Sequence, residues 1–123
     1  MLKTTTGERP GAAAAPEPLD AAMEARAEEA AVLMKALSNP CRLMILCLLA
    51  DGEKSVHELE ERLAVRQPTV SQHLARLRAE GFVATRREGR QIYYRLADER
   101  VRRVLDALYA AYCAADAPAA AGA

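Results

Sequence analysis

The sequence lacks a long apolar run. None of its apolar stretches approaches the roughly 20 residues that a membrane-spanning helix needs. No apolar segment follows Lys3 and Arg9, as it would in a secretory signal. We therefore expect a cytoplasmic protein with no membrane partner. With 123 residues, 51% of them hydrophobic, the chain has room for one domain with a modest core.

Histidine and cysteine are scarce. The chain has two histidines and three cysteines, whereas a zinc site needs about four nitrogen or sulfur ligands held together. We cannot assemble such a set from these residues. The chain also lacks the Cys-x-x-Cys motif and the βαβ pattern of small thiol oxidoreductases. We therefore predict no metal, no cofactor and no enzymatic activity, and a thiol oxidoreductase remains a low-ranked alternative.

The chain has no net charge, with 17 basic and 17 acidic residues, but its charges are unevenly distributed. Residues 62–95 carry eight Arg and two Glu, whereas residues 1–61 carry six basic and eleven acidic residues. Basic charge gathered in this way provides the phosphate contacts from which salt-dependent affinity for DNA arises. Residues 62–95 are therefore the candidate nucleic-acid-binding part of the chain.

The two ends of the chain contain few residues that could form a core. Residues 1–18 are rich in Thr, Gly, Ala and Pro, and residues 117–123 form an Ala-rich tail. Such segments cannot bury much apolar surface, so we expect a disordered arm and a disordered tail. The folded domain is predicted to comprise residues 19–116.

Residues 66–78 are predicted to form a helix that offers short polar side chains and cations to DNA. Pro68 suits a first helical turn, where its missing N–H would have no partner. Three apolar residues recur at helical spacing and would bury one face: Val70, Leu74 and Leu77. The predicted base and phosphate contacts on this helix are Gln67, Thr69, Ser71, Gln72, His73 and Arg76. Taken alone, the segment also fits a solvated amphipathic helix.

The segments on either side favour the DNA-binding interpretation. Ser55 and Glu58 have the spacing of a capping box, which would begin a short helix that ends at Leu63. Residues 64–66 would then connect it tightly to the next helix, which gives a helix-turn-helix. After Gly81, residues 82–87 and 91–96 are predicted to form a β-hairpin around residues 88–90. Such a hairpin would be a wing, and it carries the predicted phosphate contacts Arg86, Arg87 and Arg90.

Three further helices are predicted, at Asp20–Leu37, with Asp20 as its cap, at Pro40–Ala50, and from Asp98 to about Ala115. The second is apolar nearly all round, so it must be covered on more than one side. So small a domain cannot bury all three helices, and a homodimer formed through the first and last helices would cover them. The predicted fold class is mainly α with a small β-hairpin wing: a dimeric winged helix-turn-helix.

Four separated strings, at residues 37–46, 67–74, 81–83 and 86–94, resemble the ArsR/SmtB family of winged-helix repressors. The resemblance extends over residues 22–113. It implies a dimeric repressor that binds a two-fold operator in double-stranded DNA and releases it when an inducer is sensed. Metal sensors of this family often have a Cys-x-Cys pair where this chain has Ser55 and His57, and others have His on the last helix, where this chain has none.

The cysteines are Cys41, Cys47 and Cys113, and each could be a small buried hydrophobe. The placement of Cys47 and Cys113 is similar to that in the SqrR/BigR group of the family, which implies a persulfide-sensing dithiol whose bridging weakens DNA binding. Cys41 is six residues before Cys47, about 120° away around a helix, and is not expected to share its site. A repressor that uses the cysteines as ligands for arsenite or a soft metal is the alternative.

Overall fold

In this computed structural model, residues 18–64 and 67–114 are described. The predicted disordered ends lie outside the described residues, apart from Pro18, and so do residues 65–66 of the predicted connection. The chain divides into two compact units, residues 1–32 and 33–123. No single helix in the described part is long and apolar enough to cross a membrane. Helices α2 and α3 reach that length and composition only together, across a sharp bend.

The helix predicted over residues 20–37 is interrupted, so that expectation is wrong. Helix α1 spans Leu19–Glu24 and α2 spans Ala27–Leu37, with a turn at residues 25–26 between them. Neither Ala25 nor Arg26 is a helix breaker, but α1 buries no side chain. Short helices gain most of their stability from packing, which α1 lacks within its own unit.

The predicted cap of this first helix is also wrong. Pro18 occupies the N-cap position of α1 and provides no side-chain cap. Asp20 lies in the first turn instead, where its carboxylate accepts the neighbouring Ala21 N–H at 2.8 Å. An acidic residue in a first turn is still favourable, because it faces the positive end of the helix dipole.

Helix α3 spans Pro40–Ala50, as predicted, and forms the centre of the second unit. The Asn39 side chain caps it by accepting the Arg42 N–H at 3.0 Å, and Pro40 occupies the first turn. Helix α3 packs against α4, α5, α6 and strand β3, which confirms that an apolar helix of this kind is covered on several sides. The buried apolar residues of α3 are Ile45, Leu46, Leu48 and Leu49.

Arg42 is the one charged residue of α3 that is buried, with 7% of its surface exposed. Its Nε donates to the Ala36 carbonyl at 2.9 Å and its Nη2 to the Lys35 carbonyl at 3.1 Å. These carbonyls lie in the last turn of α2, where no helical N–H can reach them. Arg42 therefore closes the C-terminal end of α2, and its charge is stabilised there by the helix dipole.

Helices α4 (Val56–Leu63) and α5 (Gln67–Ala79) form the predicted helix-turn-helix. The capping box is confirmed: Ser55 Oγ accepts the Glu58 N–H at 3.1 Å, and the Glu58 carboxylate accepts the Ser55 N–H at 2.8 Å. Two backbone hydrogen bonds close the C-terminal end of α5. The Gly81 N–H donates to the Arg78 carbonyl, and the Phe82 N–H donates to the Leu77 carbonyl. Gly81 has a φ of +83°, which a left-handed helix end of this kind requires.

Ala64 ends α4 in the left-handed conformation, with φ 56° and ψ 40°. Because a β-carbon is unfavourable there, we predict that Ala64→Gly stabilises the protein by about 0.5–1 kcal/mol. Thermal unfolding should show a rise of a few degrees in the midpoint, whereas Ala75→Gly inside α5 should lower stability by about 1 kcal/mol. An Ala64→Gly protein less stable than the parent would contradict this assignment.

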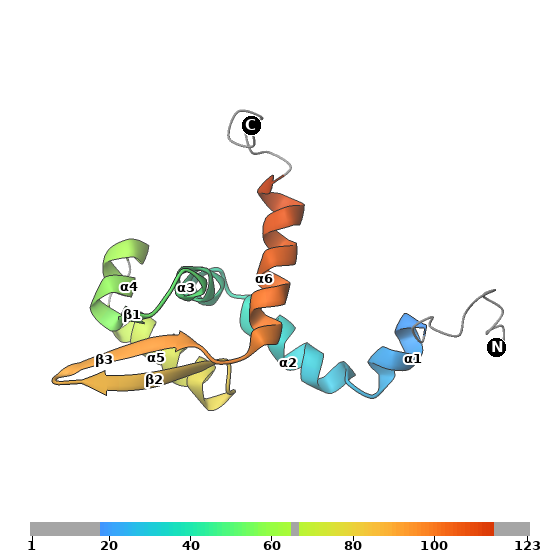
Figure 1. The fold of residues 1–123 in the computed structure, drawn as a ribbon, viewed down its shortest axis with the longest axis horizontal. Coiled ribbons are helices and arrows are strands. Elements are labelled where there is room, and N and C mark those ends of the chain that lie inside the picture. The colour runs from blue at the N-terminus through green and yellow to red at the C-terminus, as the bar shows by residue number, and fades with distance from the viewer. Residues whose placement is uncertain (1–17, 65–66, 115–123) are drawn as a thin grey trace. The chain divides into compact units, whose positions relative to one another are not determined.

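Strands β2 (Val83–Glu88) and β3 (Gln91–Leu96) form the predicted hairpin, joined by Gly89 and Arg90. In Figure 1 the hairpin extends beyond the helices of its unit. A third strand, β1 (Lys54–Ser55), was not predicted, and it pairs antiparallel with β3 in the sheet order β1-β3-β2. This strand joins the start of the helix-turn-helix to the wing.

Helix α6 spans Glu99–Tyr112, close to the predicted start at Asp98, and Asp98 caps it: its carboxylate accepts the Arg100 N–H at 2.9 Å. Val101 and Leu105 face the core, and the helix packs against α3 and β3. The helix ends before Ala115, with Cys113 at its C-cap position.

Candidate nucleic-acid interface and dithiol

The helix α5 divides its residues between core and solvent as the sequence predicts. Val70, Leu74 and Leu77 are completely buried. Of the predicted DNA contacts on this helix, Thr69, Gln72 and Arg76 are exposed, Ser71 and His73 are half-buried, and the side chain of Gln67 lies outside the described ones. A row of hydroxyl, amide and guanidinium groups on one helix face can donate to and accept from base edges and phosphates.

His73 is the one titratable group on this face with a shifted pKa. Burial lowers the pKa of His73, and the charges of Arg42 and Arg76 lower it further. The shift favours the neutral imidazole, which has one nitrogen that donates and one that accepts. Arg76 itself lies 3.6 Å from the Glu80 carboxylate one turn later.

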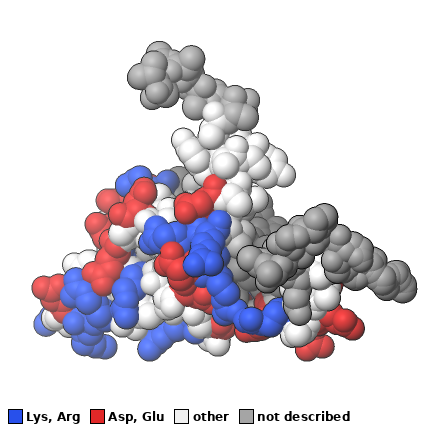
Figure 2. All heavy atoms as spheres, turned by 45° about the vertical axis from the view of Figure 1, so that its right-hand side comes forward, with Lys and Arg blue, Asp and Glu red and all other residues white. Residues whose placement is uncertain are grey.

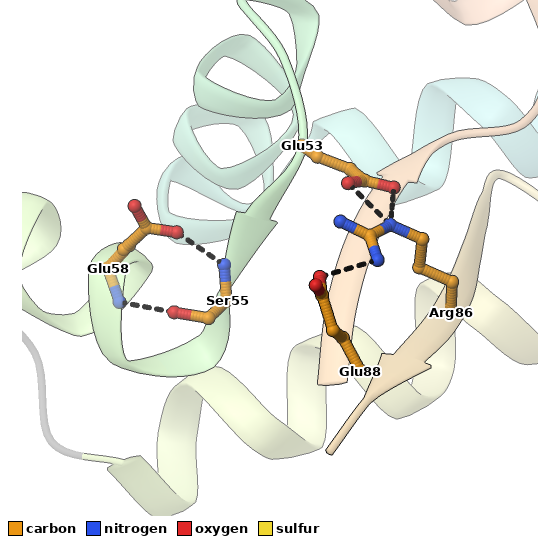
Figure 3. Close-up of polar contacts among 5 residues, drawn as sticks. All are labelled: Glu53, Ser55, Glu58, Arg86 and Glu88. Atoms are coloured by element: carbon orange, nitrogen blue, oxygen red, sulfur yellow. Dashed lines mark hydrogen bonds and ion pairs between the residues drawn. The ribbon is translucent and has the colours of Figure 1, made fainter. Parts of the chain in front are cut away.

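The three wing arginines differ in their surroundings. Arg87 and Arg90 are exposed and form no ion pair with any residue that the structure describes. Arg86 is engaged: its Nε lies 2.8 and 2.9 Å from the two carboxylate oxygens of Glu53, and its Nη1 lies 2.9 Å from Glu88 (Figure 3). These partners raise the pKa of Arg86, so it remains a cation at any ordinary pH.

Arg86 also packs on an aromatic ring. Its guanidinium carbon lies 4.7 Å from the centre of the Tyr93 ring, and Tyr93 is the cross-strand neighbour of Arg86 on β3. Tyr93 in turn pairs with Ser55 on β1. Arg86 therefore stands where all three strands meet, whereas Arg87 and Arg90 lie toward the tip of the hairpin.

The charged side chains are unevenly distributed between the wing and the end of α6. Figure 2 shows Lys and Arg atoms at the lower left, on the side where Figure 1 draws the hairpin, and also across the centre of this face, with acidic atoms interspersed. The described part of the projection above, at the end of α6, has few charged atoms. Helix α6 has no charged residue after Asp106, and Tyr109 and Tyr112 are 59% and 73% exposed. The end of α6 is thus an apolar surface that no described residue of its own unit covers.

Cys47 and Cys113 lie at the ends of two helices, α3 and α6, that pack together. Cys47 is half-buried in the last turn of α3, and Cys113 is exposed at the end of α6. Burial raises the pKa of Cys47, and the neighbouring charges of Cys113 and Asp51 raise it further. Because the charge of Cys113 acts on Cys47 and the two helices pack together, these thiols form a candidate dithiol.

Cys41 has a different environment. It is half-buried in the first turn of α3, and burial raises its pKa while the charge of Arg42 opposes that shift. Neither Cys47 nor Cys113 contributes to its shift. In the described part of the chain, no three His, Cys, Asp or Glu residues are grouped so that they could hold a metal ion.

Sequence reasoning did not single out two groups that contact these sites. Glu53 binds Arg86 across 33 positions of sequence, and Arg102 of α6 donates from its Nη1 to the Ala50 carbonyl of α3 at 2.9 Å, across 52 positions. No short sequence motif predicts either contact. The only available signal was an acidic residue just before the capping box and a basic residue in the first half of α6.

Three comparisons with known proteins agree. The model of the arsR family of bacterial regulatory proteins matches residues 39–85. The chain is similar to the biofilm growth-associated repressor of Agrobacterium fabrum, with 57% identity over 93 residues, which cover 76% of this chain and 80% of that protein.

Two solved structures extend the similarity to the fold. The transcriptional repressor BigR from Xylella fastidiosa superposes with a TM-score of 0.75 and 47% identity, over 79% of this chain and 99% of that one. The homodimeric winged helix-turn-helix DNA-binding domain Mb0332 from Mycobacterium bovis superposes with a TM-score of 0.64 and 36% identity, over 79% and 88%.

Proposed function

This chain belongs to the ArsR family as a DNA-binding transcriptional repressor, and we propose that a Cys47–Cys113 dithiol switches its affinity for operator DNA in response to persulfides. The observation that carries the proposal is that Cys47 and Cys113 lie at the ends of two packed helices, α3 and α6, with Cys113 among the charges that act on Cys47. The similarity to repressors that include BigR supports it. The protein acts as a homodimer, which the apolar, uncovered end of α6 and the homodimeric Mb0332 domain support.

The chemistry needs no oxidant other than the persulfide. A cysteine thiolate attacks the outer sulfur of a persulfide RSSH, so that RSH leaves and the cysteine becomes Cys–SSH. The second thiolate then attacks the inner sulfur of that group and releases hydrogen sulfide. The two thiols lose two electrons to form one S–S bond, and the persulfide is reduced to RSH and hydrogen sulfide. A second persulfide equivalent would insert one more sulfur atom into the bridge and release one more RSH.

The two thiols are suited to different steps. In the single subunit Cys113 is the more exposed of the two thiols, so we infer that it attacks first. Cys47 is half-buried with a raised pKa, so a smaller fraction of it is thiolate at neutral pH. It is placed to act second, within the same subunit, where the high effective concentration compensates for that smaller fraction.

Bridging would alter DNA binding because it ties α3 to α6. If α6 forms the dimer contact, a shift of α3 relative to α6 changes the separation of the two α5 helices. Two recognition helices must enter major grooves about one helical turn apart, roughly 34 Å, so a small change in their separation weakens both contacts. The base contacts proposed on α5 are Gln67, Thr69, Ser71, Gln72, His73 and Arg76.

The exposed wing arginines, Arg87 and Arg90, are proposed phosphate contacts. Loss of one such contact should reduce the slope of log affinity against log salt by roughly one unit. We therefore predict a shallower slope for Arg90→Ala in titrations of operator DNA at several salt concentrations. Arg103→Ala, which removes an exposed arginine from α6, is the control and should keep the slope of the parent. A slope unchanged in Arg90→Ala would place this side chain away from the DNA backbone.

The proposal is tested by the affinity of one protein sample for operator DNA in three states. The reduced protein should bind tightly, the persulfide-treated protein should bind at least about fivefold more weakly, and subsequent reduction should restore tight binding. Arsenite and cadmium ions added to the reduced protein are the comparison. Release by these ions, with no release by persulfide, would replace the proposal with the soft-metal alternative.

A further inference from the structure

The last turn of α3 is where the dithiol region meets the wing. Cys47 lies three residues before the end of α3 at Ala50, and the Ala50 carbonyl is held by Arg102 of α6. Asp51 follows at the C-cap position, and its charge reaches Cys47. Glu53 comes two residues later, directly before β1. Only two residues therefore separate the end of a cysteine-bearing helix from the carboxylate that binds Arg86.

The carboxylate of Glu53 is attached to the wing through Arg86. Both of its oxygens lie within 2.9 Å of Arg86 Nε, and Figure 3 shows the Arg86 side chain reaching across from β2 to meet it. Within the wing, Arg86 is fixed further by Glu88 and by the Tyr93 ring. A displacement of Glu53 is thus passed to a guanidinium that is firmly attached to β2 and β3.

The ion pair contributes little to folding. The Arg86 and Glu53 side chains are 46% and 28% exposed, and pairs in such contact with water stabilise proteins weakly. The core beneath does not depend on it, since no residue of the pair is buried. A contact that spans 33 positions and adds little stability is better explained by the position it gives to the wing.

We propose that the Glu53–Arg86 ion pair transmits the state of the dithiol to the wing, so that Arg86 is a positioning residue and Arg87 and Arg90 are the residues it positions. When a bridge draws the last turn of α3 toward α6, Glu53 moves with that turn. Arg86 and the hairpin follow, and the two exposed arginines leave the phosphates. This inference rests on the proposed dithiol switch and adds its route to the DNA.

The link predicts a specific defect in Glu53→Gln, which keeps the size of the side chain but loses its charge. The test uses the full-length protein in a buffer of reduced and oxidised glutathione, with and without operator DNA. The fraction bridged is read by alkylation and mass spectrometry. By linkage, a DNA that prefers the reduced protein must shift this equilibrium toward the dithiol, by the same factor as bridging weakens binding.

In the parent we expect the operator to produce this shift, and in Glu53→Gln we expect the factor to fall by about 2- to 30-fold. Without DNA, the two proteins should have the same redox equilibrium. Arg86→Lys keeps the charge but loses the guanidinium, whose Nε contacts Glu53 while its Nη1 contacts Glu88. This variant should resemble Glu53→Gln. Glu88→Gln removes the other partner of Arg86, inside the wing, and should behave as the parent does.

A Glu53→Gln protein with the full shift would overturn the link and leave the dithiol switch intact. A parent protein with no DNA-dependent shift would instead overturn the switch itself, and the link with it. Thermal unfolding of each variant checks that it is folded. An equal loss of coupling in Glu88→Gln would mean that any disturbance of the wing is enough to break the coupling, which also contradicts the assignment.

Discussion

Cys47→Ser and Cys113→Ser proteins should bind operator DNA as tightly as the reduced parent and should keep that affinity after persulfide treatment. Each variant retains one thiol of the pair, which can take up a sulfur atom but has lost the partner that would resolve it, so the bridge between α3 and α6 cannot form. Serine is close to cysteine in size, and neither position is fully buried, so both variants should fold. Titration of labelled operator before and after treatment measures the response, which should disappear.

Cys41→Ser is the matched control. The Cys41 side chain also lies on α3 and is also half-buried, but it is at the other end of the helix and is not among the charges that shift the pKa of Cys47. This variant should lose operator affinity on persulfide treatment as the parent does. A Cys47/Cys113 double variant that still released DNA would return these cysteines to the role of core packing.

Replacement of Ser71 or Gln72 by Ala should weaken specific binding by about 1–3 kcal/mol, which is about 5- to 150-fold in Kd. These residues follow the first turn of α5, the part of a recognition helix that reaches base edges. Gln72 is exposed and Ser71 is half-buried, and neither belongs to the completely buried row of α5, so their loss should not unfold the helix. Affinity for operator and for random DNA of the same length gives the two numbers to compare.

Random DNA is the internal control for this prediction. Phosphate contacts alone support non-specific binding, so Ser71→Ala and Gln72→Ala should bind random DNA nearly as the parent does. An equal loss on both DNAs would contradict the assignment of base contacts to this helix face. It would point to a change in the position of α5 instead.

The parts of the fold that could be predicted are those with local signals. Asn39-Pro40 marks the start of α3, Ser55 and Glu58 mark the start of α4, and Gly81 marks the end of α5; each acts through hydrogen bonds to backbone within a few residues. The break at residues 25–26 has no such signal, because both residues favour helix. It reflects missing packing, which a sequence pattern does not reveal.

The elements that were missed depend on contacts between distant residues. Strand β1 has two residues, and it exists because Lys54 and Ser55 pair with Tyr94 and Tyr93. The ion pair between Arg86 and Glu53 depends on the same pairing, which places the segment after α3 across β3 from β2. Cys47 and Cys113 are likewise distant in sequence, and the resemblance to the family, not their spacing, placed them together in the prediction.

The most direct test of the central claim is the mass of the reduced parent protein after exposure to a persulfide, followed by peptide mapping. The account predicts a Cys47–Cys113 link within one chain, seen as a loss of two hydrogen masses or as that loss plus whole sulfur atoms, and a return to the starting mass on reduction. The fraction linked should equal the fraction of protein that has lost operator affinity. DNA release without a link between these two residues, or a link between the two subunits instead, would contradict the account.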